Sequence, residues 1–149
     1  PAAQSAGVRL ALQPMSPQDF DWTFLHTLDA TESILTEINH PSLGISLGTA
    51  HVPLTSTSLS RVTDLAPWIA SVQLADVGAR TGKYDQRLPG EGQLPLAELI
   101  ARLESAEYRG WYELEVWSRD LWKLDSETLM GKCLESLGCL VPASTPVDA

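Results

Sequence analysis

The sequence predicts an α/β fold built around a parallel sheet. Short apolar runs alternate with segments in which apolar residues recur at helical spacing, and four of these strand-then-helix units follow one another. The clearest unit begins with the apolar run 69–75, passes through a polar loop and the helical segment 94–106, and ends in a second apolar run at 110–116. Two strands joined through a helix are expected to be parallel, because such a unit demands a crossover connection.

The expected strands are short and bounded by turn-forming residues. Pro14 stops the first strand. In the second strand apolar residues alternate with small ones, so that Ser46 and Gly48 share the inner face. The strands are predicted over residues 8–13, 43–48, 69–75 and 110–116.

The expected helices are amphipathic and carry recognisable end signals. Ser56 or Ser58 is expected to cap the second helix, and Pro95 suits the first turn of the third. Ser126 is expected to cap the last helix and Gly138 to stop it. The helices are predicted over residues 27–38, 56–65, 95–106 and 126–137.

Length and charge narrow the class of protein. The 149 residues fit one domain, and the formal net charge is −9 with ten scattered Lys and Arg residues. This balance argues against nucleic acid and membrane surfaces as partners, because an acidic chain repels polyphosphate and anionic lipid. No apolar run approaches the ~20 residues of a membrane span, and no signal peptide is evident, so a cytoplasmic protein is expected. Cys133 and Cys139 fall on different faces of one predicted helix and are expected to stay reduced.

The ends of the four strands present a set of polar or small residues. Strand alternation is expected to turn their apolar neighbours Leu12, Leu47, Leu74 and Val116 towards the helices. In parallel α/β folds, sites are built where the strands end. Four positions are expected at one level on the concave side of the sheet: Gln13, Gly48, Gln73 and Glu115.

Five segments carry a family resemblance. Together they resemble the C-terminal half of a xylose-isomerase-like TIM barrel, and most closely the sugar phosphate isomerase/epimerase family. The resemblance runs from about Val8 to about Leu137, and its most specific part is the Arg-Leu-Pro-Gly-Glu-Gly loop followed by a helix and the Tyr-Glu-Leu-Glu strand. The segments are Leu12–Met15, Leu43–His51, Val72–Asp76, Arg87–Gly92 and Tyr112–Glu115.

The resemblance implies a chemistry for the family. A divalent metal (Mn, Mg, Zn or Co) is held by Glu, Asp, His and Glu at four strand ends, and it assists aldose–ketose isomerisation or epimerisation of a sugar or sugar phosphate. The family's substrate-contacting histidine falls on His51 and its loop arginine on Arg87. The metal ligands fall, position by position, on Gln13, Gly48, Gln73 and Glu115.

Three of these four positions depart from the family pattern. Gln13 lacks the charge of glutamate, Gly48 has no side chain, and Gln73 offers an amide in place of an imidazole. A hard cation prefers several anionic oxygens, so this chain is expected to bind a metal weakly or not at all. Glu115 remains the candidate catalytic residue and would be a metal ligand only if a metal is bound.

Several side chains have a structural reading beside the functional one. His51 contacts a sugar or stabilises its loop, and Arg87 holds a substrate oxygen or ties its loop to Asp76 or Glu91. Glu115 is expected to find a partner, either Arg87 or a metal, because an unpaired buried carboxylate is costly.

Three other features are open in the same way. Glu113, one layer deeper than Glu115, is expected to be a satisfied interior carboxylate. Turn geometry explains Gly90 and Gly92. The tryptophans Trp111, Trp117 and Trp122 line a sugar-binding wall or pack in the core.

Four strand–helix units make half of a (β/α)₈ TIM barrel, since a closed barrel needs ~250 residues. We expect an N-terminal stub at 1–7, the C-terminal half-barrel at 8–140 and a flexible tail at 141–149. The missing units would come from an N-terminal half-barrel, on a longer or a separate chain, or from a second copy of this chain. The start at Pro1 favours a longer or split protein.

Three functions are compatible with the sequence. The first is a sugar phosphate isomerase/epimerase-like enzyme of which this is one half. The second is a catalytically silent barrel that binds a sugar or a protein partner. The third is a metal-independent lyase or epimerase that uses Glu115 and His51 as an acid/base pair.

Overall fold

Four parallel strands form the centre of the molecule. A computed structural model describes residues 1–17, 21–78 and 84–140. The strands form one sheet in the order in which they occur in the chain, and every neighbouring pair is parallel, as predicted. They are β1 (Leu10–Leu12), β2 (Leu43–Gly48), β3 (Ile69–Leu74) and β6 (Trp111–Leu114).

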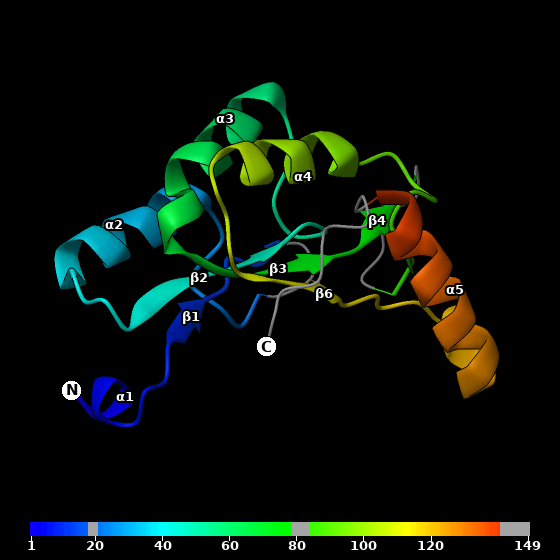
Figure 1. The fold of residues 1–149 in the computed structure, drawn as a ribbon, viewed down its shortest axis with the longest axis horizontal. Coiled ribbons are helices and arrows are strands. Elements are labelled where there is room, and N and C mark those ends of the chain that lie inside the picture. The colour runs from blue at the N-terminus through cyan, green and yellow to red at the C-terminus, as the bar shows by residue number, and fades with distance from the viewer. Residues whose placement is uncertain (18–20, 79–83, 141–149) are drawn as a thin grey trace.

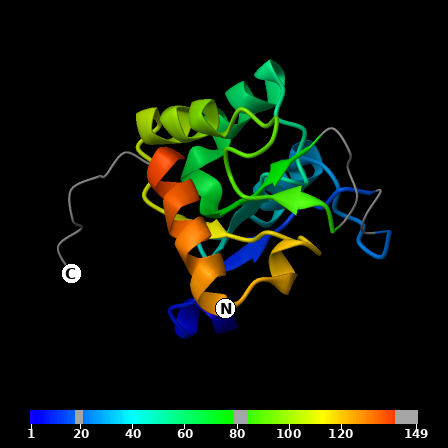
Figure 2. The same ribbon diagram turned by 90° about the vertical axis from the view of Figure 1, so that its right-hand side faces the viewer.

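Helices cover one face of this sheet. Figure 1 shows three of them side by side above the strands: α2 (Leu28–Ile38), α3 (Ser56–Leu65) and α4 (Leu96–Ser105). A further helix, α5 (Ser126–Leu140), stands at the end of the molecule next to α4 (Figures 1 and 2). A short helix, α1 (Ala2–Ser5), begins the chain. Single 3₁₀ turns, η1 (Ala66–Trp68) and η2 (Leu121–Lys123), precede β3 and α5.

The core lies between the sheet and the helices. Leu47 and Leu74 are fully buried and Leu12 packs against them, which confirms that these side chains face the helices. Burial of each large aliphatic side chain contributes about 1.5–3 kcal/mol. The largest fully buried side chains are Ile45, Leu47, Leu59, Leu65, Leu74, Leu88, Leu96, Leu99, Leu103, Val62 and Val72.

The predicted element bounds agree closely with the structure. The bounds predicted for the second strand and second helix are those of β2 and α3. β1 and β6 are shorter than predicted because the flanking residues leave the ladder. Pro95 precedes α4 as its N-cap residue and does not lie in the first turn.

The cap of α3 differs from the prediction by one residue. Thr55, and not Ser56 or Ser58, is the N-cap. Its hydroxyl accepts a hydrogen bond from the backbone N–H of Ser58 at 3.3 Å, while the hydroxyl of Ser58 accepts one from the backbone N–H of Thr55 at 2.7 Å. This reciprocal capping box satisfies two N–H groups that have no partner within the helix.

The predicted start of α5 is confirmed, but its predicted cap and its predicted end are wrong. Asp125 caps the helix, because its carboxylate accepts a hydrogen bond from the backbone N–H of Thr128 at 2.9 Å, and Ser126 is the first helical residue. Gly138 does not stop the helix, which continues to Leu140. Glycine ends a helix when it adopts a positive φ, and Gly138 does not.

A small hairpin that the sequence analysis treated as loop follows β3. Its strands β4 (Asp76–Val77) and β5 (Gln86–Arg87) are antiparallel. The two cysteines are free, as predicted. Among the described residues no helix is long and apolar enough to cross a membrane. The predicted tail 141–149 lies outside the described residues.

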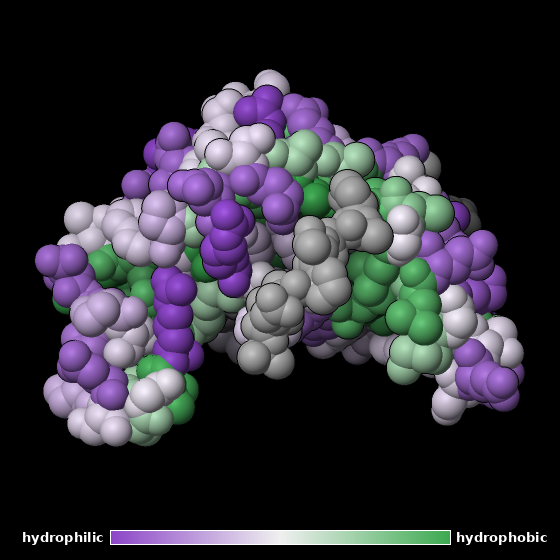
Figure 3. All heavy atoms as spheres, viewed as in Figure 1, coloured by the Kyte–Doolittle hydropathy of each residue, from purple (hydrophilic) through white to green (hydrophobic). Residues whose placement is uncertain are grey.

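The face of the sheet opposite α3 and α4 is open. Within the described chain β1 bonds only to β2, and β6 bonds only to β3. Figure 3 shows the molecule hollowed on this side, between α1 and α5. Leu10 on one edge strand is 56% exposed and Trp111 on the other is 79% exposed. Four parallel units with two open edges are half of the number that closes a barrel.

Candidate functional site

Two glutamine side chains meet on the open face of the sheet. Gln13 directly follows β1, and Gln73 lies near the end of β3. The amide Nε2 of Gln13 donates a hydrogen bond to Oε1 of Gln73 at 2.5 Å. The structure therefore brings together two of the four positions that the sequence analysis placed at the strand ends.

Gly48, at the end of β2, lies beside this pair. A Cβ atom built on Gly48 would lie 2.8 Å from Cδ2 of His51 and 3.2 Å from Nε2 of Gln13. The His51 ring therefore occupies the space that a side chain at position 48 would need. Glycine at this position and the observed placement of His51 depend on each other.

Glu115 is partnered by an aromatic residue and not by Arg87. The indole Nε1 of Trp117 donates a hydrogen bond to Oε1 of Glu115 at 3.1 Å. In the described chain no ion pair joins Glu115 to Arg87, so the expected pairing is wrong. The neighbouring indole supplies the hydrogen bond that a half-buried carboxylate needs.

The strand register places Glu113 directly opposite Gln73. Glu115 lies two residues further along, towards the end of the strand. Strands in a barrel are tilted, with a stagger of about one residue from each strand to the next, so residues at one height are not register partners. The same tilt lets Gln13 reach Gln73, although Gly48 is the register partner of Gln73.

Asp76 organises the loop that carries Arg87. Its carboxylate is fully buried and accepts hydrogen bonds from four backbone N–H groups at 2.8–3.1 Å. The donors are Val77, Gly90, Gly92 and Leu94. The sequence analysis named Asp76 only as a partner for Arg87, but the carboxylate holds the loop through backbone amides.

Arg87 itself is exposed and lies on β5, where its backbone pairs with that of Asp76. Its guanidinium packs over Gly78, where an added Cβ would lie 2.7 Å from Nε. Within the described residues it forms no ion pair with Asp76 or Glu91. Gly90 has a positive φ of 88°, which confirms turn geometry there, whereas Gly92 is needed for its close approach to Asp76.

The three tryptophans do not form one wall. Trp111 lies at the start of β6 and is 79% exposed, far along the strand from Trp117. Trp117 and Trp122 instead pack on Tyr84, with ring centroids 6.0 Å and 5.6 Å from it. The guanidinium of Arg119 lies 5.2 Å from the centre of the Tyr84 ring. An aromatic cluster at the strand ends thus lies next to Glu115 through Trp117.

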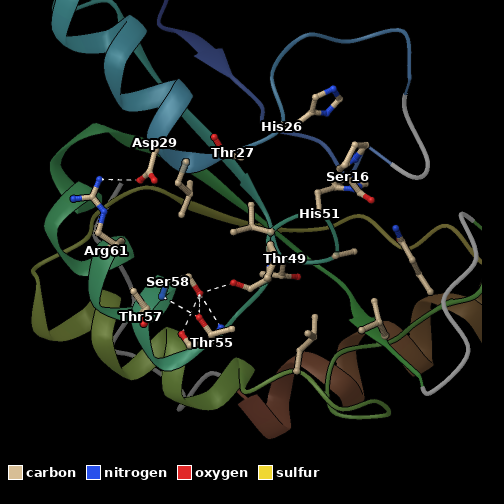
Figure 4. Close-up of a pocket in the computed structure, with 18 of the residues that line it drawn as sticks. Ser16, His26, Thr27, Asp29, Thr49, His51, Thr55, Thr57, Ser58 and Arg61 are labelled. Atoms are coloured by element: carbon tan, nitrogen blue, oxygen red, sulfur yellow. Dashed lines mark hydrogen bonds and ion pairs between the residues drawn. The ribbon is translucent and has the colours of Figure 1, made fainter.

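A cavity of about 800 Å³ has His51 as one of its lining residues. Figure 4 shows it between the loop after β1, the first turns of α2 and α3, and the β2–α3 connection. Polar side chains that line the cavity interact with other parts of the protein. The hydroxyl of Thr49 donates a hydrogen bond to the carbonyl oxygen of Ala75 at 2.6 Å, and Arg61 forms an ion pair with Asp29 at 3.3 Å. The sequence gives no signal of this cavity, because its walls come from several segments that are far apart in the chain.

Comparison with known proteins identifies the fold. A family model described as xylose isomerase-like TIM barrel matches residues 1–138. The chain belongs to this family. It is half of a (β/α)₈ barrel, which confirms the fold class expected from the sequence. No match was found among curated proteins.

Solved xylose-isomerase-like structures resemble the chain over about half of their own length. The IolI protein with a bound zinc atom has a TM-score of 0.82 and 18% identity, over 93% of this chain and 51% of its own. Protein SMc04130 of Sinorhizobium meliloti 1021 has a TM-score of 0.79 and 23% identity, over 93% and 52%. D-psicose 3-epimerase of Clostridium cellulolyticum H10 with D-tagatose has 0.72 and 16%, over 92% and 50%. At these identities the likeness shows the fold alone.

The strand-end residues of this xylose-isomerase-like chain do not fit a divalent metal. The amides of Gln13 and Gln73 bond to each other, Gly48 offers no donor atom, and one oxygen of Glu115 is held by Trp117. Across residues 1–17, 21–78 and 84–140, no three His, Cys, Asp or Glu side chains gather in a way that could hold a metal ion. A hard cation requires more anionic oxygen than these residues supply.

Proposed function

We propose that this chain is half of a sugar isomerase/epimerase-type barrel that has lost the metal-assisted chemistry and binds a small sugar. The hydrogen bond between Gln13 and Gln73 is the observation that carries the proposal. The amides of Gln13 and Gln73 stand where the family pattern has a glutamate and a histidine ligand, and because they bond to each other neither needs a cation as a partner. Glu115 then has no metal to coordinate and is held by Trp117.

The class of ligand is suggested by structural relatives. One relative is an epimerase solved with D-tagatose, and another holds a zinc atom. A site at the strand ends is supported by the general rule that ligands in this architecture bind there. His51, in the loop that follows β2, is the residue to which we assign a contact with a sugar hydroxyl.

The partner of the open face is part of the same proposal. This chain spans about half the length of these relatives, and a closed barrel needs twice as many strand–helix units as the chain supplies. A complementary half-barrel of four units would pair with the edges β1 and β6 and cover Leu10 and Trp111. An N-terminal half is the occupant we favour, and a second copy of this chain is the other outcome of the test.

Metal analysis of the purified full-length protein tests the proposed loss of metal binding. Inductively coupled plasma mass spectrometry should find far less than one divalent ion per chain. The triple variant Gln13→Glu, Gly48→Asp, Gln73→His should gain a stoichiometric ion, provided that His51 swings away from position 48. One tightly held native ion per chain that disappears in Glu115→Gln would overturn the proposal.

Calorimetric titration with D-tagatose tests the proposed binding of a small sugar. Heat of binding should be observed in the presence of excess chelator and should be unchanged by added Mn²⁺. Absence of binding for every ketose and polyol tested would leave the fold assignment intact and refute sugar binding.

A further inference from the structure

We propose that Gln13 and Gln73 form a neutral, metal-free binding site for two adjacent hydroxyl groups of an uncharged polyol. This inference rests on the proposed function and names how its ligand is held. In this site the two amides bind the ligand's hydroxyl groups directly by hydrogen bonds, without a metal ion between them.

The inventory of donors and acceptors supports the inference. A primary amide carries two N–H donors and one carbonyl oxygen that accepts two bonds. The bond from Gln13 Nε2 to Gln73 Oε1 leaves the carbonyl of Gln13 and the amino group of Gln73 without a partner among the described residues. The pair thus keeps one acceptor group, the carbonyl of Gln13, and one donor group, the amino group of Gln73, for a ligand. Two neighbouring hydroxyls, each able to donate and accept, match this arrangement.

Burial and packing keep the pair in place. Both side chains are half-buried, so they are partly fixed and still reachable from the open face of the sheet. Gly48 leaves the space next to Gln13 without a side chain, and the ring of His51 fills part of it. A preorganised amide pair loses little conformational entropy on binding.

The charges nearby select an uncharged ligand. Glu113 and Glu115 follow one another on the inner face of the neighbouring strand, and the chain as a whole carries a net charge of −9. One oxygen of Glu115 is held by Trp117, which leaves the other to accept from a hydroxyl. A phosphate brought to this edge would be repelled by the carboxylates of Glu113 and Glu115, so a free sugar or polyol is favoured over its phosphate.

The test uses isothermal titration calorimetry on the full-length protein in excess EDTA. The probes are D-tagatose and D-fructose 6-phosphate. We expect D-tagatose to bind and the phosphate to bind at least tenfold more weakly. Gln13→Leu and Gln73→Leu should each weaken D-tagatose binding about tenfold or more, the loss of one good hydrogen bond. The matched control Gln4→Leu, on the exposed face of α1, should leave it unchanged.

Each other outcome has a definite meaning. Binding that survives both leucine variants overturns the inference and leaves sugar binding itself standing. Binding that appears only with added Mn²⁺ overturns the inference and the metal-free function together, as does the absence of binding. If a leucine variant fails to fold, the side-chain amide resonances of wild-type Gln13 and Gln73 decide the question. They should shift on addition of D-tagatose, and unchanged resonances at saturation would refute the contact.

Discussion

The fully buried carboxylate of Asp76 accepts hydrogen bonds from four backbone N–H groups, three of which belong to the loop 88–94. This single residue fixes the loop that follows β5, and with it the position of Arg87. Hydrogen bonds to a charged acceptor are the strong ones, at roughly 1.5–3 kcal/mol each in net terms. The contacts could not be predicted, because the sequence does not show which backbone amides return to a given aspartate.

Asp76→Asn should therefore destabilise the protein by about 2–3 kcal/mol, because an amide N–H₂ would face N–H donors that keep no partner. Urea unfolding followed by fluorescence measures the change. Asp64→Asn, on the exposed surface of α3, is the matched control and should stay within about 0.5 kcal/mol. Equal stability of the two variants would contradict the role assigned to Asp76.

Replacing each of two glycines by alanine is expected to change the stability of the protein in opposite directions. A Cβ on Gly92 would collide with Oδ1 of Asp76 and with the carbonyl of Val77, which lies 2.5 Å away. Gly92→Ala should cost about 1–3 kcal/mol. Gly131 lies inside α5, and a Cβ there meets nothing within 4 Å, so Gly131→Ala should stabilise the helix by about 0.5–1 kcal/mol. Thermal unfolding measures both changes. Unfolding temperatures that shift in the same direction in the two variants would contradict this packing.

Among the elements, those with strong periodicity were predictable and those made by tertiary contact were not. β2 and α3 were predicted with their observed bounds because apolar residues recur there at clean spacings of two or of three and four. The hairpin of β4 and β5 has strands of two residues, too short to leave a pattern in the sequence. Caps shifted by one residue because neighbouring Ser, Thr and Asp residues are all competent caps.

The start of α5 gives a test that depends on pH. A hydrogen bond from the backbone of Thr128 lowers the pKa of Asp125 below its ordinary value of 3.8. The folded state therefore favours the ionised carboxylate, and its contribution is present above pH ~3.8 and lost as the pH falls through the lower folded-state pKa. Hydrogen-exchange protection of the Thr128 amide should decline in that window.

Asp125→Ala should remove this protection at neutral pH, whereas Ser126→Ala, at the residue that the sequence suggested as cap, should not. Loss of protection in Ser126→Ala alone would show that the serine caps the helix.

At the scale of the molecule, the two faces of the sheet differ: helices cover one face, and the other face is open. The helix-covered face carries the core, whereas the opposite face leaves Trp111 exposed, and Leu10 is exposed on the edge strand β1. Figure 3 also shows apolar surface on α5, whose Met130 and Leu134 are 60% and 64% exposed. The number of units and the resemblance were readable from the sequence. The mutual bond of Gln13 and Gln73 was not, because it joins residues 60 positions apart.

Expressed alone, this segment should therefore self-associate, since an open parallel sheet with apolar edges recruits further strands. Light scattering after size-exclusion chromatography should find a dimer or larger species. Co-expression with a complementary N-terminal half should convert it to a one-to-one complex. A stable, monodisperse monomer would contradict the half-barrel partner.

The central claim is that the strand ends hold a hydrogen-bonded amide pair where a cation would otherwise lie. Anomalous diffraction from crystals of the full-length protein grown with excess Mn²⁺ tests it most directly. We predict that Gln13 and Gln73 remain hydrogen-bonded and that no anomalous peak lies among Gln13, Gly48, Gln73 and Glu115. A peak about 2.0–2.6 Å from oxygens of Gln73 and Glu115, with the amides turned apart to coordinate it, would contradict the claim.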